Sequence, residues 1–129
     1  MADILVDSTL FEDFRSGDSG ARDVIDTILD GEVTAAISPL TVFHLWNEPD
    51  MERRTEITYS SILSFLEEAP FTIAASKQAG LWIASAHADE RGRLVYFAMV
   101  AATAKERGEV ICTRNSKQFE NFYDGFTAY

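Results

Sequence analysis

The stretch AMVAATAKERGEVICTRNSKQF, residues 98–119, decides the fold of this chain. Its first half is rich in alanine and ends at Gly108, a pattern that predicts a helix closed by a glycine. Residues 110–113 form a short apolar run with β-branched side chains, which is typical of a buried strand. A polar turn follows, and Ser116 can cap a further short helix. A helix, a tight link, a buried strand and a polar turn make half of a parallel α/β unit, whose chemistry usually lies at the carboxyl end of the strand.

Outside this stretch, apolar runs and helical patterns alternate along the chain. Ser8 and Ser38 are candidate caps of the helices that follow the first two strands. Strands are predicted at residues 4–6, 33–37, 71–73 and 126–129, and the longer helices at residues 39–48, 51–68 and 76–91. This order predicts a central, mostly parallel sheet of four or five strands between two layers of helices, a three-layer α/β/α sandwich.

The composition is that of an ordinary globular protein. The 129 residues are long enough to bury a core and are expected to form a single domain over residues 1–129. No apolar run reaches the length of a membrane span, and no basic region precedes the apolar N-terminal stretch, so we expect a cytoplasmic protein. The only cysteine, Cys112, lies in the predicted buried strand and is expected to be a core thiol.

The charge is unevenly distributed along the chain. The formal net charge of −10 argues against nonspecific nucleic-acid binding. Residues 1–90 hold 17 acids and 5 bases, whereas residues 91–117 hold 2 acids and 6 bases. The six bases predict either one phosphate-facing patch or ordinary solvated helix faces, and the sequence leaves both interpretations open. They are Arg91, Arg93, Lys105, Arg107, Arg114 and Lys117.

Polar residues at strand ends are the remaining candidates for chemistry. The chain has no GxGxxG or Walker-type loop and no GxSxG turn, which excludes the sites that depend on these motifs. The two histidines lie far apart and form no ligand motif with the single cysteine. Asp7 follows the first strand, and Thr113 and Asn115 follow the strand of the central stretch. Because parallel strands whose order reverses bring their carboxyl ends together, we expect these residues to line one crevice.

Three segments together resemble PIN-domain proteins, in particular the VapC-type toxins of prokaryotic toxin–antitoxin pairs. They are ILVDST near the N-terminus, SPLTVFHLW after the second strand, and AMVAATAKERGEVICTRN. The resemblance covers nearly the whole chain and implies a PIN-like fold with a Mg²⁺- or Mn²⁺-dependent endoribonuclease site. It also implies a homodimer and a small, DNA-binding VapB-like antitoxin whose tail covers the crevice.

The resemblance assigns four positions to the active site. Carried over residue by residue, the first and last fall on Asp7 and Asn115, with Thr113 as the neighbouring hydroxyl. The second and third fall on His44 and Phe97, so two acidic ligand positions are replaced. Phenylalanine cannot ligate a metal, and imidazole prefers softer ions than Mg²⁺. We therefore expect catalytic roles for Asp7, Asn115 and Thr113, metal ligation by Asp7 and Asn115, and weak or absent nuclease activity.

Glu48 and four of the basic residues are further candidate functional residues, and two alternative functions stay open. Glu48, one turn beyond His44, is a candidate substitute ligand. The alternative function is a non-catalytic PIN fold that binds protein or RNA, in which His44 is a polar filler and Phe97 packs where a metal would lie. An unrelated α/β interaction domain is a third reading. If RNA binds, the expected contacts are Arg91, Arg93, Arg114 and Lys117.

Overall fold

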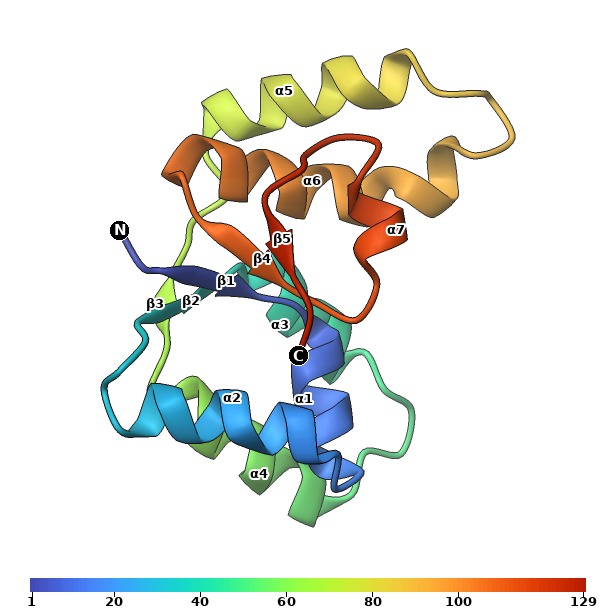
Figure 1. Ribbon diagram of the computed structural model, residues 1–129. Coiled ribbons are helices and arrows are strands. Elements are labelled where there is room, and N and C mark those ends of the chain that lie inside the picture. Colours follow the sequence, from blue (N-terminus) through green and yellow to red (C-terminus); the bar gives the residue numbers. More distant parts are fainter.

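The computed structural model describes all residues, 1–129, and contains a five-stranded parallel sheet between layers of helices (Figure 1). The strands follow the order β3-β2-β1-β4-β5 across the sheet. Every neighbouring pair of strands is parallel, and the predicted three-layer α/β/α sandwich is confirmed. The strands are β1 (Ile4–Val6), β2 (Ala35–Ile37), β3 (Glu67–Glu68), β4 (Val110–Cys112) and β5 (Phe126–Thr127).

Seven helices cover the two faces of this sheet. In Figure 1, α2 and α4 lie below the sheet, whereas α5 and α6 lie above it. No helix is both long and apolar enough to span a membrane. The helices are α1 (Ser8–Arg15), α2 (Ser19–Leu29), α3 (Pro39–Trp46), α4 (Arg53–Leu63), α5 (Ile73–Ala84), α6 (Arg91–Arg107) and α7 (Ser116–Phe119).

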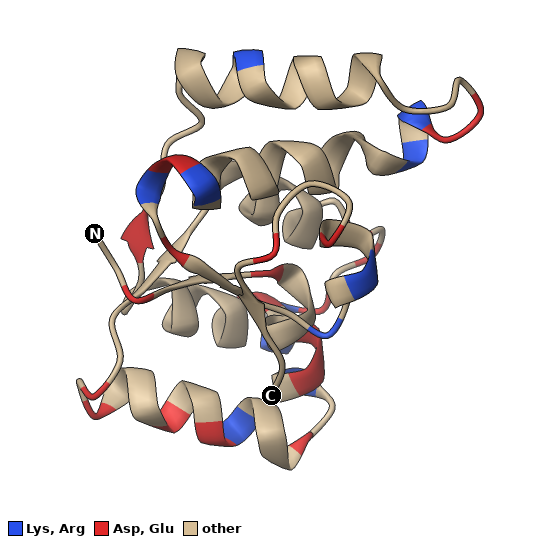
Figure 2. Cartoon of the chain, turned by 45° about the horizontal axis from the view of Figure 1, so that its top comes forward, with Lys and Arg blue, Asp and Glu red and all other residues tan.

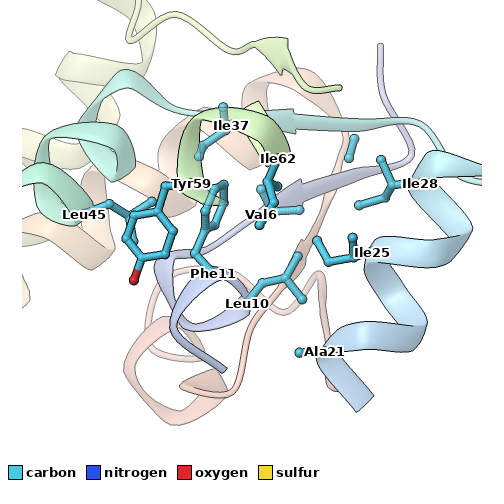
Figure 3. Packing of buried hydrophobic residues seen from close by; sticks show 11 residues of the cluster. Val6, Leu10, Phe11, Ala21, Ile25, Ile28, Ile37, Leu45, Tyr59 and Ile62 are labelled. Atoms are coloured by element: carbon cyan, nitrogen blue, oxygen red, sulfur yellow. The ribbon is translucent and has the colours of Figure 1, made fainter. Parts of the chain in front are cut away.

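Each face of the sheet packs into its own core. Side chains alternate along a strand, so Leu5 joins the cluster beside α6 while Val6 joins the cluster formed by α1, α2 and α4. Figure 3 shows this second cluster, in which the rings of Phe11 and Tyr59 meet edge to face at 5.6 Å. Both rings are fully buried. Complete burial of one such large apolar side chain stabilises the fold by about 2 kcal/mol.

The alanine-rich stretch forms α6, and its small side chains let α5 pack closely against it. Ala75 and Ala79 of α5 meet Ala98 and Ala102 of α6 in a separate buried cluster. Gly108 ends α6 in the left-handed conformation, at φ 68°, as the sequence predicts. The chain then reverses directly into β4, and this reversal places β4 beside β1.

The predicted third strand at residues 71–73 is wrong. The chain pairs with β2 earlier, at Glu67 and Glu68. The sequence pattern missed this strand because two exposed acidic residues at the edge of a sheet give no apolar signal. α5 begins at residue 73 instead, since the Thr72 hydroxyl accepts the N–H of Ala75 at 3.1 Å and caps the helix. The preceding helix, α4, accordingly ends at Leu63 and does not reach residue 68.

The predicted helix boundaries near Gly92 are also wrong. α5 ends at Ala84, and α6 begins at Arg91, so Gly92 lies in the first turn of α6 and does not close the preceding helix. Among the predicted caps, Ser38 is confirmed, because its hydroxyl accepts the N–H of Leu40 at 3.1 Å.

Two other predicted caps are displaced by one residue. Asp7 and Asn115 hold the cap positions of α1 and α7, and Ser8 and Ser116 are the first helical residues. Neither cap residue bonds its helix through its side chain. Both side chains that the sequence marks as functional are therefore free of a capping role.

The strand order reverses next to β1. The connection after β1 leads to β2 on one side, whereas the chain returns from β3 to β4 on the other side. Such a reversal opens a crevice at the carboxyl ends of the two central strands. In this sheet, that position lies just beyond Val6 of β1 and Cys112 of β4, which are paired in register.

Candidate functional site

Asp7 and Thr113 come together at the carboxyl ends of β1 and β4. The register pairs Val6 with Cys112, so the next residue of each strand lies side by side. Both side chains are fully buried, and the Thr113 hydroxyl donates to Asp7 Oδ2 at 2.8 Å. The same hydroxyl oxygen accepts the backbone N–H of Asn115 at 2.9 Å. The structure thus places the Asp7 and Thr113 side chains in contact, whereas Asn115 joins them only through its backbone N–H.

Tyr96 of α6 supplies the second contact to the Asp7 carboxylate. Its hydroxyl donates to Asp7 Oδ1 at 2.8 Å and lies 2.9 Å from the Thr41 hydroxyl of α3. Burial raises the pKa of Tyr96 well above its ordinary value, and the negative charge of Asp7 raises it further. The phenol therefore keeps its proton. Asp7 forms no ion pair, so its buried charge is held by neutral hydroxyl donors.

The residues at the two positions that the resemblance assigns to acids, His44 and Phe97, both contact Tyr96. His44 is exposed, and its ring stacks on the Tyr96 ring with centroids 5.3 Å apart and planes 28° apart. Phe97 meets the Tyr96 ring edge to face at 5.3 Å and the buried Phe119 ring at 5.1 Å. Because His44 is exposed and stacked, it does not fill a collapsed interior as the sequence-based alternative assumed.

The other candidate ligands do not complete a metal site. The Asn115 side chain is exposed and makes no hydrogen bond within the chain. Glu48 lies beyond the end of α3 and pairs with Arg15 at 3.3 Å. Glu12, one helical turn beyond Asp7 on α1, has its carboxyl pKa raised by partial desolvation; the His44 charge opposes that rise and the Asp7 charge adds to it.

The residues present do not fit a resident divalent cation. Mg²⁺ requires several oxygen ligands in near-octahedral geometry, and Mn²⁺ sites likewise need clustered donors. Asp7 is the only carboxylate bonded to the Tyr96 and Thr113 hydroxyl groups, and both of its oxygens already accept hydrogen bonds. Nowhere in the chain do three or more acidic, histidine or cysteine side chains gather in a metal-binding arrangement.

The basic residues of the 91–117 region do not form one patch. Figure 2 shows them at both ends of α6 and on α7. Arg107 is buried in ion pairs with Glu67 and Glu109, about 20 Å along the helix from Arg93. Arg93 pairs with Glu90 and also bonds Gln118 of α7, the helix that carries Lys117.

Arg114, a predicted RNA contact, is engaged within the chain. Its guanidinium pairs with Asp13 at 2.7 Å and with Asp18 at 3.1 Å, and it lies over the Tyr129 ring. Arg91 donates to the carbonyl groups of the α5–α6 connection. Lys117 is the one predicted RNA contact that forms no ion pair or side-chain hydrogen bond within the chain.

Sequence reasoning missed Tyr96, the residue that determines the chemistry of this crevice. Tyr96 directly precedes Phe97, the position that the family resemblance assigns to an acid. An aromatic residue in an amphipathic helix usually indicates packing, and nothing in the local pattern marks its hydroxyl. The available signal was that the resemblance assigns acids to positions 44 and 97, which hold histidine and phenylalanine, so another group has to satisfy Asp7.

The fold is similar to that of known toxin–antitoxin proteins. No family model matches the sequence, and the comparison with curated proteins finds no match. Among solved structures, DNA-bound VapBC from Salmonella typhimurium is 19% identical, with 100% of this chain and 98% of that chain covered at a TM-score of 0.72. VapBC2 from Rickettsia felis, bound to a promoter DNA fragment, is 13% identical, with 98% of each chain covered and a TM-score of 0.70.

A further solved structure gives the same result. PAE2754 from Pyrobaculum aerophilum is 17% identical, with 98% of this chain and 88% of that chain covered at a TM-score of 0.64. The chain therefore has the PIN-like fold of VapC toxins, which confirms the fold implied by the sequence motifs.

Proposed function

We propose that this chain is the toxin-type member of a two-protein pair and acts by binding an antitoxin-like helix. The observation that carries this proposal is an apolar groove of about 260 Å³ between α2 and α4. Leu29, Ile57 and Phe65 line it and are 47%, 54% and 56% exposed. Apolar side chains gathered in this way are typical of a surface that binds a partner. Several similar structures are VapBC complexes, which supports a VapB-like partner.

Charge beside the groove indicates which helix fits it. The α2 side of the groove is acidic, with one base, Arg22, against four exposed acids: Asp23, Asp26, Asp30 and Glu32. A complementary helix therefore has Leu or Ile on one face and Lys or Arg along the edge that faces α2. Apolar contact supplies most of the affinity, and the charges orient the helix in the groove.

A synthetic peptide tests this proposal. We expect a fluorescent amphipathic peptide with Leu and Lys faces to bind the wild type, measured by anisotropy, and to lose binding at least tenfold in Ile57→Glu. Ile73→Glu is the matched control, because Ile73 is 78% exposed but lies on α5, on the opposite side of the sheet. Equal losses in both variants, or equal binding of a peptide with Glu in place of Lys, would contradict the proposal.

A second copy of the chain is the proposed occupant of another apolar surface. A hollow of about 260 Å³ between α5 and α6 is lined mainly by apolar residues, including Phe71, Ile83 and Met99. Leu81 is 67% exposed on the same helix hairpin. We expect a homodimer in sedimentation experiments and a monomer for Leu81→Glu. A monomeric wild type at high concentration would contradict this expectation.

A weak Mg²⁺- or Mn²⁺-dependent endoribonuclease, acting in the cytoplasm, is the second candidate function. It is supported by the convergence of Asp7, Thr113 and Asn115 at the strand ends. RNA contacts are then expected from Arg91, Arg93, Arg114 and Lys117. The test is cleavage of labelled RNA with either metal by the wild type and by Asp7→Ala. Activity that requires both metal and Asp7 would favour this candidate, whereas no cleavage at millimolar Mn²⁺ would exclude it.

A further inference from the structure

A chain of hydrogen bonds through the Asp7 carboxylate connects five elements at the carboxyl edge of the sheet. Thr41 of α3 bonds Tyr96 of α6, and Tyr96 donates to Asp7 after β1. Thr113 after β4 donates to the other Asp7 oxygen and accepts the N–H of Asn115, which opens α7. We propose that the Tyr96 hydroxyl holds the place of a divalent cation beside Asp7, and that this carboxylate is a structural group of the fold.

Full burial of the carboxylate supports this assignment. A hydrated cation reaches a carboxylate only if the carboxylate faces water or other oxygen ligands. Asp7 has no exposed surface, and the Tyr96 oxygen lies 2.8 Å from the carboxylate oxygen that would bind the cation. A cation–oxygen bond of about 2.1 Å cannot form on that side while the phenol oxygen remains there.

The two replaced acidic positions support Tyr96 from different sides. His44 stacks on one face of the Tyr96 ring, and Phe97 packs against its edge. Phe97 is in turn held by Phe119, which is fully buried. Both positions that the family resemblance assigns to metal ligands therefore contact the residue that stands in for the metal. The side chains at the two assigned ligand positions, His44 and Phe97, thus help to hold the Tyr96 hydroxyl beside Asp7.

The stability of this arrangement should respond to added cation and to loss of Asp7 in the opposite way to that of an acidic metal cluster. In a cluster, carboxylates repel one another, so a cation raises stability and removal of one acid relieves repulsion. Here Asp7→Ala removes the acceptor of two buried hydroxyl donors, Tyr96 and Thr113, and leaves them unpaired. We expect a lower melting temperature for Asp7→Ala and no effect of millimolar Mn²⁺ on the wild type.

A pair of tyrosine variants separates this role from ordinary packing. Tyr123 is the matched control, because its hydroxyl also donates a hydrogen bond, here to the neutral Glu109 carbonyl at 2.9 Å, away from the crevice. We expect Tyr96→Phe to lower the melting temperature by several degrees, and by more than Tyr123→Phe, because it withdraws a donor from a buried charge. Equal shifts in the two variants would overturn the proposal.

Stabilisation by Mn²⁺ tests the proposal further, because a purely packing role of Tyr96 would not make the melting temperature depend on the cation. Tyr96→Ala opens space beside Asp7, so we expect Mn²⁺ to raise its melting temperature and to have no effect on the double variant with Asp7→Ala. An unresponsive Tyr96→Ala overturns the proposal, and if this variant does not fold, the comparison of Tyr96→Phe with Tyr123→Phe decides.

A wild type stabilised by Mn²⁺ through Asp7 also overturns the proposal and favours the ribonuclease candidate. That result would leave peptide binding at the α2–α4 groove untouched, because the inference concerns the crevice alone. The two proposals can therefore fail separately.

Discussion

Two carboxylates are completely buried in this protein, one at each end of the same sheet. Glu109 lies before β4, and its oxygens accept Arg107 Nε at 2.7 Å, Arg107 Nη2 at 3.0 Å and the N–H of Ala2 at 2.9 Å. Asp7 lies after β1 and accepts only two neutral hydroxyl groups. One buried charge is compensated by a cation, and the other is not.

Glu109 belongs to a buried ion pair, whereas the Asp7 charge is held by neutral hydroxyl donors alone. A buried charge without a countercharge acts on its surroundings, and Asp7 contributes to the raised pKa values of Tyr96, Cys112 and Glu12, after burial in each case. Burial of a charge without a cationic partner is costly, and the two hydroxyl donors offset part of that cost at Asp7. This dependence on two hydroxyl donors agrees with a structural role for Asp7 beside Tyr96 and Thr113.

The largest expected effect is at the compensated end. Arg107→Met leaves Glu109 buried without a cation, which we expect to lower the free energy of unfolding by about 3–5 kcal/mol in urea titrations. The control is Arg93→Met, because Arg93 and Glu90 form an ion pair at the surface with both side chains about half exposed. We expect this variant to lose no more than about 1 kcal/mol. Similar losses in both variants would show that Glu109 does not depend on Arg107.

Replacing each buried acid by its amide compares the two ends directly. Glu109→Gln removes the charge that Arg107 faces, and we expect a loss of about 2–3 kcal/mol. Asp7→Asn costs less, about 1 kcal/mol, because the amide accepts from one hydroxyl and donates to the other. Urea unfolding of both variants checks the order. A larger loss for Asp7→Asn would mean that the two hydroxyl groups require a full negative charge.

Gly108 brings the compensated pair together, and its replacement has a smaller effect. The residue has φ 68° between Arg107 and Glu109, and a Cβ there would meet no neighbouring atom. Gly108→Ala therefore costs only the left-handed conformation, about 1 kcal/mol. Gly80→Ala in α5 is the control, and we expect it to raise stability, because that site is also open and alanine favours a helical backbone more than glycine does. The two thermal shifts should differ in direction.

The fold could be predicted from sequence because its strongest signals are local. Residues 98–119 contain a helix, a left-handed glycine and a buried strand in immediate succession, and all three are confirmed. β3 could not be predicted, since two exposed glutamates carry no apolar pattern and pair only because β2 lies beside them. The boundary between α5 and α6 failed because Gly92 is tolerated in a first helical turn.

The candidate site was predictable only in part. Asp7 and Thr113 follow strands that the sequence identifies, so parallel topology brings them together. Tyr96 and Thr41 reach the same place from two helices, and their contact depends on how α3 and α6 lie against the sheet. The hydrophobic periodicity of the sequence does not show how these two helices pack against the sheet. The sequence left two interpretations of the bases in residues 91–117 open for the same reason, since it does not show that Arg107 and Arg114 pair with acids from distant segments.

The smallest expected effect is at Cys112, whose thiol pKa reports the electrostatic influence of the Asp7 charge. The thiol is buried next to the end of β4, and burial, followed by the charge of Asp7, raises its pKa from 9.0 to about 11. Between these values the unfolded chain has released the thiol proton and the folded chain retains it, so stability falls as pH rises. The contribution is complete below pH 9, and about 1 kcal/mol of it is lost by about pH 10. Urea unfolding across this range should therefore show a steeper decline for the wild type than for Cys112→Ala, with an intermediate slope for Asp7→Asn. Parallel profiles for the wild type and Asp7→Asn would mean that the Asp7 charge does not act on the thiol of the neighbouring strand.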